Sequence, residues 1–273
     1  MIRRLTREDK DAVSRLCARA VSEDFIPLYF DSFVDEKIGF GFEESGVLTG
    51  VVFSSVALDG EAWLFGLRVD PDHRRKGIGR RLTQRALEEV SESCRLARVG
   101  IFTDNYASLQ LARSFGFSAR ANYVFREFRG SPPPLPETCL KRVGLENLEE
   151  VFGRLASDSR LQQNNLLLPH FYEWFRLTRE SLGILLDDGS VWQADDELAV
   201  VARSEAPDPE VEFGYLSDPC EVILPALLDR FVGQEPIEAS LPADPALEEV
   251  LERYGFAVPS WGSAMTIYER LLP

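Results

Sequence analysis

A short basic loop between a strand pattern and a helix pattern constrains this chain more than any other feature. The strand-like run Phe65–Val69 ends at Asp70-Pro71, and a helical pattern begins inside the basic segment that follows, Arg74-Arg75-Lys76-Gly77-Ile78-Gly79. The first amides of a helix have no partner within the helix, and the helix dipole adds about half a positive charge there. Glycine has no side chain to keep an anion away from those amides. The loop therefore predicts an anion site that a diphosphate would fill.

The charges around the loop point the same way. Between residues 68 and 85, seven arginine and lysine residues stand against two aspartates, a local excess of five positive charges in a chain of net charge −15. Two other phosphate-binding motifs fit less well, because a dinucleotide GxGxxG would have Leu82 at its third glycine and no GxxxxGK(S/T) is present. A glycine turn before a solvated basic helix start stays open as the alternative when the GxG pair is taken alone.

Three segments within residues 1–128 together resemble the GCN5-related N-acetyltransferases. Residues 74–79 match that family's (Q/R)xxGx(G/A) pyrophosphate loop. Asn105-Tyr106-Ala107-Ser108 is similar to its NxxA/S element, and Phe115-Gly116-Phe117 resembles its closing GF element. The three occur in the order that the family shows.

The periodicity of the first half alternates in a way that agrees with this resemblance. The hairpin dipeptides Ser45-Gly46 and Asp59-Gly60 separate strand-like runs. The order of elements predicts an α+β fold with a mixed, mostly antiparallel central sheet flanked by helices. We expect helices over 6–20, 77–94 and 108–115, a helical or irregular aromatic stretch over 24–33, and strands over 37–43, 47–58, 61–69, 97–103 and 121–128.

One proline-rich stretch divides the chain into two halves of different charge. Residues 1–130 carry 20 basic and 19 acidic side chains, a net charge of +1, whereas residues 131–273 carry 10 and 26, a net charge of −16. Triple proline suits a semi-rigid connector. We therefore predict domains at 1–130 and 137–273 joined by a linker at 131–136, with a surface loop inside one domain as the alternative.

The second half repeats the first in outline. Phe213–Pro219 echoes Phe65–Pro71 at an offset of 148 residues, and Tyr254-Gly255-Phe256 echoes the first GF element. No glycine or arginine follows Pro219 immediately, where the first half has its basic loop. The pattern predicts a second, degenerate copy of the same fold that lacks the pyrophosphate loop, with an unrelated domain as the alternative.

The resemblance implies acetyl-CoA as cosubstrate and no metal. It implies that the loop amides hold the diphosphate, that the main chain at Leu67 and Val69 pairs with the pantetheine arm, and that Asn105 bonds to the same arm beside Ser108. A helix N-cap is the structural alternative for Asn105. The implied cofactor-binding residues are Leu67, Arg68, Val69, Arg74, Arg75, Lys76, Gly77, Ile78, Gly79, Arg80, Asn105 and Ser108.

The family's catalytic residues match this sequence less well than its cofactor-binding residues do. The position of the family's frequent base is Trp63, which cannot accept a proton, and that of its frequent general-acid tyrosine is Ala112. Glu61 lies two residues before Trp63 on the same strand face and could act through a water. An exposed structural role for Glu61, and direct attack by an already neutral amine, both stay open.

The resemblance implies only the chemical class of the molecule that accepts the acetyl group. Phe25 and Tyr29 fall where the family builds its acceptor site, in a segment that is also similar to histidine N-acetyltransferase-like proteins, and packing of the first helices is the alternative. The resemblance implies an N-acetyltransferase that acts on the primary amine of a small molecule such as a free amino acid. Two alternatives stay open: acetylation of a peptide or protein amino terminus, and a non-catalytic acyl-CoA-binding regulator.

Composition excludes several other classes. The four cysteines form no CxxC pair and the chain has two histidines, which argues against a disulfide framework or a histidine metal site. No apolar run reaches the roughly 18 to 20 residues of a membrane span, and the amino terminus lacks a signal-peptide core. A net charge of −15 disfavours nucleic acid. We expect a cytoplasmic protein; the sequence does not indicate its oligomeric state.

Overall fold

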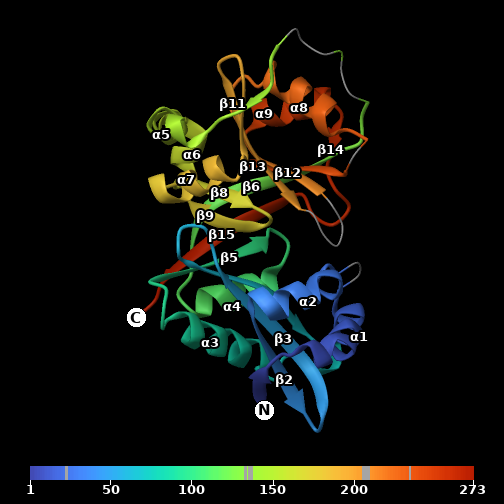
Figure 1. Ribbon diagram of the computed structural model, residues 1–273. Helices are drawn as coiled ribbons and strands as arrows, with labels where there is room; N and C mark the ends of the chain where they lie inside the picture. Colours follow the sequence, from blue (N-terminus) through green and yellow to red (C-terminus); the bar gives the residue numbers. More distant parts are fainter. Residues whose placement is uncertain (22–23, 132–133, 135–137, 205–209, 234) are drawn as a thin grey trace. The chain divides into compact units, whose positions relative to one another are not determined.

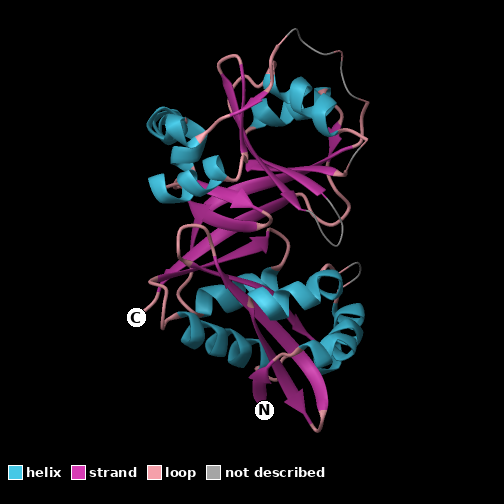
Figure 2. Cartoon of the chain, in the orientation of Figure 1, coloured by secondary structure: helices cyan, strands magenta, loops and turns pink. Residues whose placement is uncertain are grey.

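The chain forms two compact units, each built from strands and helices (Figures 1 and 2). The computed structural model describes residues 1–21, 24–131, 134, 138–204, 210–233 and 235–273. Unit 1 comprises residues 1–100, 105–118 and 268–273, and unit 2 comprises residues 101–104 and 119–267. Of the predicted linker, only Ser131 and Pro134 fall among the described residues.

Unit 1 is organised around an antiparallel meander to which one parallel strand is added. The strands β1, β2, β3 and β4 pair antiparallel in that order, and β5 pairs parallel to β4. Their bounds are β1 Ile2–Arg4, β2 Ile38–Glu44, β3 Val47–Val56, β4 Ala62–Val69 and β5 Leu96–Phe102. The helices are α1 Lys10–Ala20, α2 Ile26–Glu36, α3 Ile78–Val90 and α4 Tyr106–Ser114, with short 3-10 turns at Arg7–Asp9 and Pro71–His73.

The turns of unit 1 form where the sequence predicts them. Ser45 and Gly46 have φ angles of 53° and 77°, which is the left-handed geometry that suits a tight hairpin between β2 and β3. Gly60 has a φ angle of 76° in the turn before β4. One core cluster then joins the apolar faces of α1 and α2 to β3, through Leu5, Val13, Leu16, Cys17, Ile26, Phe30, Val51 and Phe53.

Unit 2 repeats this order of elements. Strands β10, β11 and β12 form an antiparallel meander, and β13 pairs parallel to β12 across α8, as β5 pairs parallel to β4 across α3. The bounds are β10 Val191–Ala194, β11 Glu197–Ser204, β12 Glu210–Leu216, α8 Ile223–Phe231, β13 Ile237–Pro242 and α9 Pro245–Arg253. Both halves therefore contain the predicted mixed, mostly antiparallel sheet with flanking helices.

Further elements of unit 2 surround this sheet. A separate hairpin pairs β8 with β9, and β6 continues the sheet beyond β13. The remaining strands are β6 Ser118–Phe128, β7 Lys141–Arg142, β8 Leu167–His170, β9 Glu173–Arg176 and β14 Phe256–Ala257, and the remaining helices are α5 Leu148–Ser157, α6 Ser159–Gln163 and α7 Arg179–Asp187, after a 3-10 turn at Leu145–Asn147. The core of unit 2 lies between α8, α9 and strands β11–β13.

The compact units do not follow the sequence boundary near residue 130. Strand β6, from the first half, pairs with β13 inside unit 2. Conversely, residues 268–273 at the end of β15 (Ala264–Leu271) belong to unit 1. There Glu269 forms a 2.8 Å ion pair with Arg98, which also pairs with Asp59 at 2.7 Å. Most of the final strand of the first half thus belongs to unit 2, and the last residues of the second half belong to unit 1. Domains at 1–130 and 137–273 with a linker at 131–136 stay a prediction.

Candidate cofactor site

The amino terminus of α3 presents a run of open amides. Gly77 is the N-cap with a φ angle of 78° and makes no side-chain cap, and Arg75 before it has a φ angle of 63°. The first amide of this turn to bond within the main chain is that of Arg81, which donates to the Gly77 carbonyl at 3.0 Å. Within the described part of the chain, the amides from Arg75 to Arg80 donate to no other group. Such a run at a helix start is an anion-binding geometry.

The two glycines of the loop serve different purposes. At Gly77 the need is conformational, because nothing lies within 4 Å of an added Cβ but φ is positive. At Gly79 an added methyl group would fit in ordinary van der Waals contact, and only a larger side chain would be crowded. A Cβ there would lie 3.7 Å from Leu67, 3.7 Å from Leu111 and 3.8 Å from Val69, so a larger side chain would have to displace these residues.

Strand β4 opens away from β5 next to this loop. Parallel pairing of the two strands covers only Ala62–Leu64 against residues 97–99, although β4 continues to Val69. A bulge in the pairing with β3 accompanies Gly66, whose φ angle is 64°. Beyond Leu64, β4 thus has a main-chain edge that β5 does not occupy, and this edge leads toward the open amides. The structure brings the predicted residues Leu67, Val69 and 77–80 together.

The basic side chains of the loop divide into two groups. Arg74 bonds to main-chain carbonyls of Val69 at 3.3 Å and Ala20 at 3.2 Å, and so fastens the loop to the end of α1. Arg75 and Lys76 are exposed and have no partner among the described residues. These two side chains therefore leave their charge available beside the open amides.

Two further arginines, also predicted to bind the cofactor, interact instead with other side chains of the protein. Arg68 forms a bidentate pair with Asp24, with hydrogen bonds of 2.6 and 3.1 Å. Arg80 donates to Ser114 at 3.1 Å, and its guanidinium lies 5.0 Å from the centre of the Phe115 ring. Counting charges in the sequence could not separate these structural arginines from Arg75 and Lys76.

Asp70 holds the turn between β4 and the loop. Its carboxylate accepts from the Asp72 amide at 2.9 Å and pairs with Arg19 at 2.8 Å. Burial acts to raise the pKa of Asp70, but hydrogen bonds from His73 and Asp72 and the charge of Arg19 together hold it below its usual range. The turn is therefore fixed by a charged carboxylate at neutral pH.

Asn105 has the capping role that was the structural alternative in the sequence. Its side-chain oxygen accepts from the Ser108 amide at 3.1 Å at the start of α4. Asn105 is exposed, Ser108 is partly buried, and the side-chain amide nitrogen of Asn105 donates to no described residue. Capping therefore leaves that nitrogen free to donate to a ligand.

Glu61 lies at the opposite end of β4 from the loop. Its Oε2 accepts from the amides of Arg95 at 3.0 Å and Leu96 at 2.7 Å, and so fixes the start of β5. Eight residues of extended chain separate Glu61 from Val69, a span of about 26 Å. The structure gives Glu61 a structural partner and does not bring it to the cofactor residues.

The aromatic residues of α2 pack over the bulged part of β4. Phe33 contacts Phe25, Tyr29 and Phe65 at ring-centre distances of 6.1, 5.9 and 5.1 Å. Phe25 is 44% exposed. Of the two predicted acceptor residues, Phe25 thus offers an accessible ring at the edge of a cluster that otherwise serves packing.

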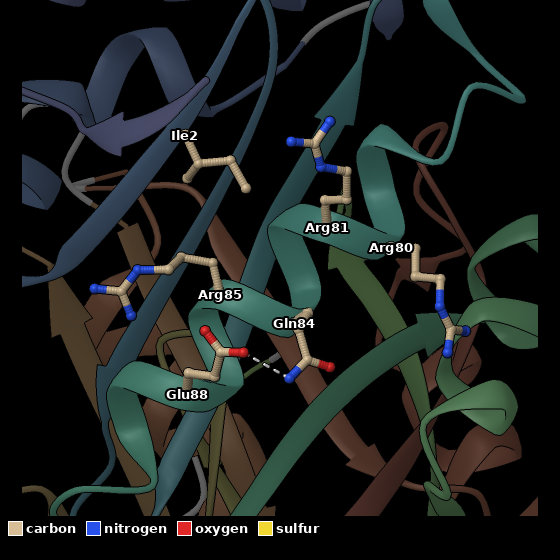
Figure 3. A pocket seen from close by; sticks show the side chains of 6 residues that line it. All are labelled: Ile2, Arg80, Arg81, Gln84, Arg85 and Glu88. Carbon is tan, nitrogen blue, oxygen red and sulfur yellow. Dashed lines mark hydrogen bonds between the residues drawn. The ribbon is translucent and has the colours of Figure 1, made fainter.

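A shallow pocket of 330 Å³ lies along α3 (Figure 3). Figure 3 shows Arg81 and Arg85 projecting on the side of α3 that carries Ile2, while Arg80 projects the other way. The guanidinium groups of Arg81 and Arg85 lie 4.7 and 4.5 Å from the rings of Phe42 and Phe40. These arginines cover β2, so the pocket is a groove beside packed side chains. The lining residues are Ile2, Arg80, Arg81, Gln84, Arg85 and Glu88.

The described residues contain no group of three or more histidine, cysteine, aspartate or glutamate side chains arranged to hold a metal ion. In the same part of the chain, no helix has both the length and the apolar character needed to span a membrane.

Comparisons with known proteins agree with this geometry. Residues 4–117 match the model of the acetyltransferase (GNAT) family. Over 93 residues the chain is 31% identical to the ribosomal protein bS18-alanine N-acetyltransferase of Escherichia coli strain K12, an alignment that covers 33% of this chain and 62% of that relative. The chain thus spans less than two thirds of the length of the curated relative.

Solved structures extend the likeness to the whole chain. The GCN5-related N-acetyltransferase from Sphaerobacter thermophilus matches with a TM-score of 0.67 at 14% identity, covering 100% of this chain and 95% of that one. The one from Kribbella flavida matches with a TM-score of 0.51 at 17% identity, covering 100% and 71%. At such identities the likeness shows the fold alone. The part of the chain that matches the acetyltransferase (GNAT) family model, residues 4–117, thus contains both the open amides of α3 and the parted strands β4 and β5.

Proposed function

We propose that this protein is an acetyl-CoA-dependent N-acetyltransferase whose cofactor site lies in unit 1. The observation that carries the proposal is the run of open amides from Arg75 to Arg80, with the free charges of Arg75 and Lys76 beside it. Six consecutive amide donors and two cations suit a diphosphate better than a single carboxylate.

The chain's own residues then have distinct tasks. The amides of 75–80 bind the diphosphate, and the open edge of β4 at Leu67 and Val69 bonds the pantetheine arm in strand fashion. The free side-chain nitrogen of Asn105 donates to the same arm. Acetyl-CoA supplies the acyl group when bound, and the acceptor amine attacks it in the neutral form. Glu61 accepts hydrogen bonds from the Arg95 and Leu96 amides at the start of β5. This structural role favours attack by the amine without a protein base.

The acceptor we propose is a primary amine of a small molecule, such as a free amino acid. Phe25 and Tyr29 would line its apolar side. The E. coli relative is named for acetylating an alanine of a ribosomal protein, so a peptide amino terminus is the second candidate. We also propose that residues 137–273 descend from a degenerate second copy, and that the protein is cytoplasmic, which agrees with its four free cysteines.

The test is release of the CoA thiol from acetyl-CoA in the presence of an amine panel. The panel contains free amino acids, short peptides with free amino termini, and the same compounds blocked at the amine. Amine-dependent release supports the enzyme, and the compound class that turns over fastest decides between the two acceptors. Tight acetyl-CoA binding without amine-dependent release would instead establish a non-catalytic acyl-CoA-binding regulator.

The role of Glu61 has its own test. Because Glu61 bonds two main-chain amides, we expect Glu61→Gln to lower the melting temperature while turnover stays within about twofold of the parent. General base catalysis would show instead as a loss of about 10² to 10⁴ in turnover, with the pH–rate profile altered.

A further inference from the structure

Arg68 lies on β4 between the two residues proposed to bond the pantetheine arm, but its side chain points to the other face of the sheet. The side chains of Leu67 and Val69 lie next to Gly79, and so face α3. Successive side chains of a strand alternate between faces, so Arg68 points away from α3. Its register partner on β3 is Val51, which packs in the core cluster with α1 and α2. Arg68 therefore starts at the proposed cofactor edge and reaches the side of the sheet that α1 and α2 cover.

Asp24, just before α2, holds the Arg68 guanidinium in one orientation. Nε and Nη2 of Arg68 donate to the two carboxylate oxygens of Asp24 at 2.6 and 3.1 Å. Nη1 donates to the Leu67 carbonyl at 3.3 Å. Asp24 in turn accepts from the Ile26 amide at 3.2 Å, at the start of α2. A guanidinium fixed in this way loses little side-chain entropy when it binds a second anion.

One edge of this guanidinium stays open. An arginine has five N–H donors, and each of two edges of its planar fork can hold a carboxylate through two parallel bonds. Asp24 occupies the Nε–Nη2 edge. On the Nη1–Nη2 edge each nitrogen has one further N–H, and within the described part of the chain no group accepts from either of them. The Arg68 side chain is 18% exposed and that of Asp24 only 2%, so the pair presents its cation to solvent and not its acid.

The guanidinium also lies beside the proposed acceptor residue Phe25. Its central carbon is 5.9 Å from the centre of the Phe25 ring. Phe25 is 44% exposed, and Leu28 on the next turn is 55% exposed, so an apolar surface continues from the ring. Arg68 thus contacts both the main chain of β4 at Leu67, where we place the pantetheine arm, and the ring that we place at the acceptor.

The groups around the pair favour an anion over a cation at the open edge. Asp24 is buried and already accepts from Arg68 and Ile26, so it has no place for an ammonium group. Burial and the neighbouring Asp24 raise the pKa of the Cys17 thiol to about 12, so that thiol is neutral at physiological pH. Arg74 bonds only to main-chain carbonyls among the described residues, which leaves its positive charge without an acidic partner there.

We propose that the open edge of Arg68 binds the α-carboxylate of the acceptor, and that the acceptor is therefore a free α-amino acid. This inference rests on the proposed function and specifies its substrate. The two carboxylate oxygens match the two open N–H groups of the Nη1–Nη2 edge. The side chain of the amino acid then lies against Phe25. A peptide amino terminus has a neutral amide at the position of the carboxylate, and a simple amine has no polar group there. Arg68 thus selects against both.

Matched acceptors test this with the full chain and acetyl-CoA. Each free amino acid is compared with its α-amide and with the amine that lacks the carboxyl group, for instance leucine, leucinamide and 3-methylbutylamine. A nearby carboxylate raises the pKa of the amine, so amine reactivity alone would favour the amide. We expect the opposite: kcat/KM should be at least about tenfold higher for an accepted amino acid than for its amide.

The outcomes separate this inference from the proposed function. An amide or a carboxyl-free amine that is acetylated as fast as its parent amino acid would overturn the role of Arg68 and leave the N-acetyltransferase in place. No acetylation of any amine would overturn both. Calorimetry gives a measurement without turnover: the N-acetylated form of the fastest amino acid should bind at least about fivefold more tightly than its amide, and equal binding of the two would contradict the carboxylate site.

Variants of the pair assign the preference to Arg68. Arg68→Lys keeps a charge beside Asp24 but loses the planar fork, so kcat/KM for the amino acid should fall by at least about tenfold while that for the amide changes less than about twofold. The double variant Arg68→Gln with Asp24→Asn should do the same without leaving a buried charge. Arg15→Lys, at an exposed position of α1, is the control and should keep the parent ratio. A parent ratio in Arg68→Lys would overturn the inference, and this variant decides alone if the double variant does not fold.

Discussion

At the scale of single residues, the basic loop at 74–79 shows which charged side chains have no partner in the folded protein. The sequence has seven basic side chains around the loop, but in the structure Arg68 and Arg74 form hydrogen bonds with other groups of the protein. Arg75 and Lys76 remain exposed and unpaired among the described residues. The affinity for a diphosphate should therefore depend on these two residues more than on the others.

The first prediction concerns these two charges. Arg75→Glu and Lys76→Glu should each weaken acetyl-CoA binding by about tenfold or more, because each charge-assisted phosphate contact is worth about 1.5 to 3 kcal/mol. Calorimetry measures the affinity. Arg15→Glu is the control, because it makes the same charge change at an exposed position of α1 and should leave the affinity unchanged. Equal loss in all three would mean that overall charge, and not the loop, attracts the cofactor.

The second prediction concerns the stability of unit 2 as a function of pH. Burial raises the pKa of Glu212 from 4.5 to about 7 in the folded chain, so between these values the folded chain holds a proton that the unfolded chain has released. Stability should therefore fall as pH rises from about 4.5 to about 7, by up to about 3 kcal/mol, and change little above that range. Melting temperatures across pH 4 to 9 should show this slope. Glu212→Gln should remove most of it, whereas a slope that persists in this variant belongs to other groups.

At the scale of elements, two glycines show how closely a helix or a strand approaches its neighbour. Gly79 lets α3 pack against Leu67 and Val69 of β4, with a Cβ already at 3.7 Å or more from its neighbours. Gly214 is in the repeated position of β12, and a Cβ there would lie 2.8 Å from the carbonyl oxygen of Pro169 in β8. Gly79 therefore leaves room beside the proposed cofactor site of unit 1, whereas Gly214, the counterpart of Gly66 in the repeat, lets β12 approach β8 in unit 2.

This difference gives the third prediction. Gly79→Ala should be tolerated, whereas Gly79→Val should weaken acetyl-CoA binding by about tenfold or more with a small change in melting temperature. Gly214→Val should do the opposite, lowering the melting temperature by several degrees while the affinity of the folded protein is retained, since overpacking costs about 1 to 3 kcal/mol. Calorimetry and thermal unfolding of the same preparations distinguish the two. Unchanged affinity of Gly79→Val would contradict the cofactor assignment.

At the scale of the whole molecule, local signals predicted the elements but not how the halves share strands. The loop, the hairpin turns and the repeat of Phe65–Pro71 at Phe213–Pro219 are local, and each lies where its pattern indicates. The pairing of β6 with β13, and the place of Glu269 beside Arg98, depend on partners about 110 to 170 residues away. The alternation of apolar residues in a strand indicates which face is buried, but it does not indicate with which other strands the strand pairs. The sequence likewise could not show which basic side chains near the loop stay without a partner, because partners such as Asp24 for Arg68 and Ser114 for Arg80 are distant along the chain.

The last prediction follows from this exchange of strands. Arg98 is 1% exposed and pairs with both Asp59 and Glu269, and Leu272 donates to the Arg95 carbonyl at 2.8 Å. Removing one partner of a buried pair costs about 3 to 5 kcal/mol, because the remaining charge stays buried. A chain cut at Pro132 loses Glu269, so the isolated first half should be unstable even though it contains the entire cofactor loop.

Two point variants test this without cutting the chain. Glu269→Ala should lower the free energy of unfolding by about 3 to 5 kcal/mol, and Arg98→Met by a similar amount because it removes the guanidinium that pairs with Asp59 and Glu269. The double variant should cost clearly less than the sum of the two, because the pair is coupled. Denaturant unfolding measures all three. Glu92→Ala, at an exposed position beyond α3, is the control and should change stability by less than about 0.5 kcal/mol. Additive losses, or a first half that folds alone with normal acetyl-CoA affinity, would show that unit 1 does not need the carboxyl-terminal strand.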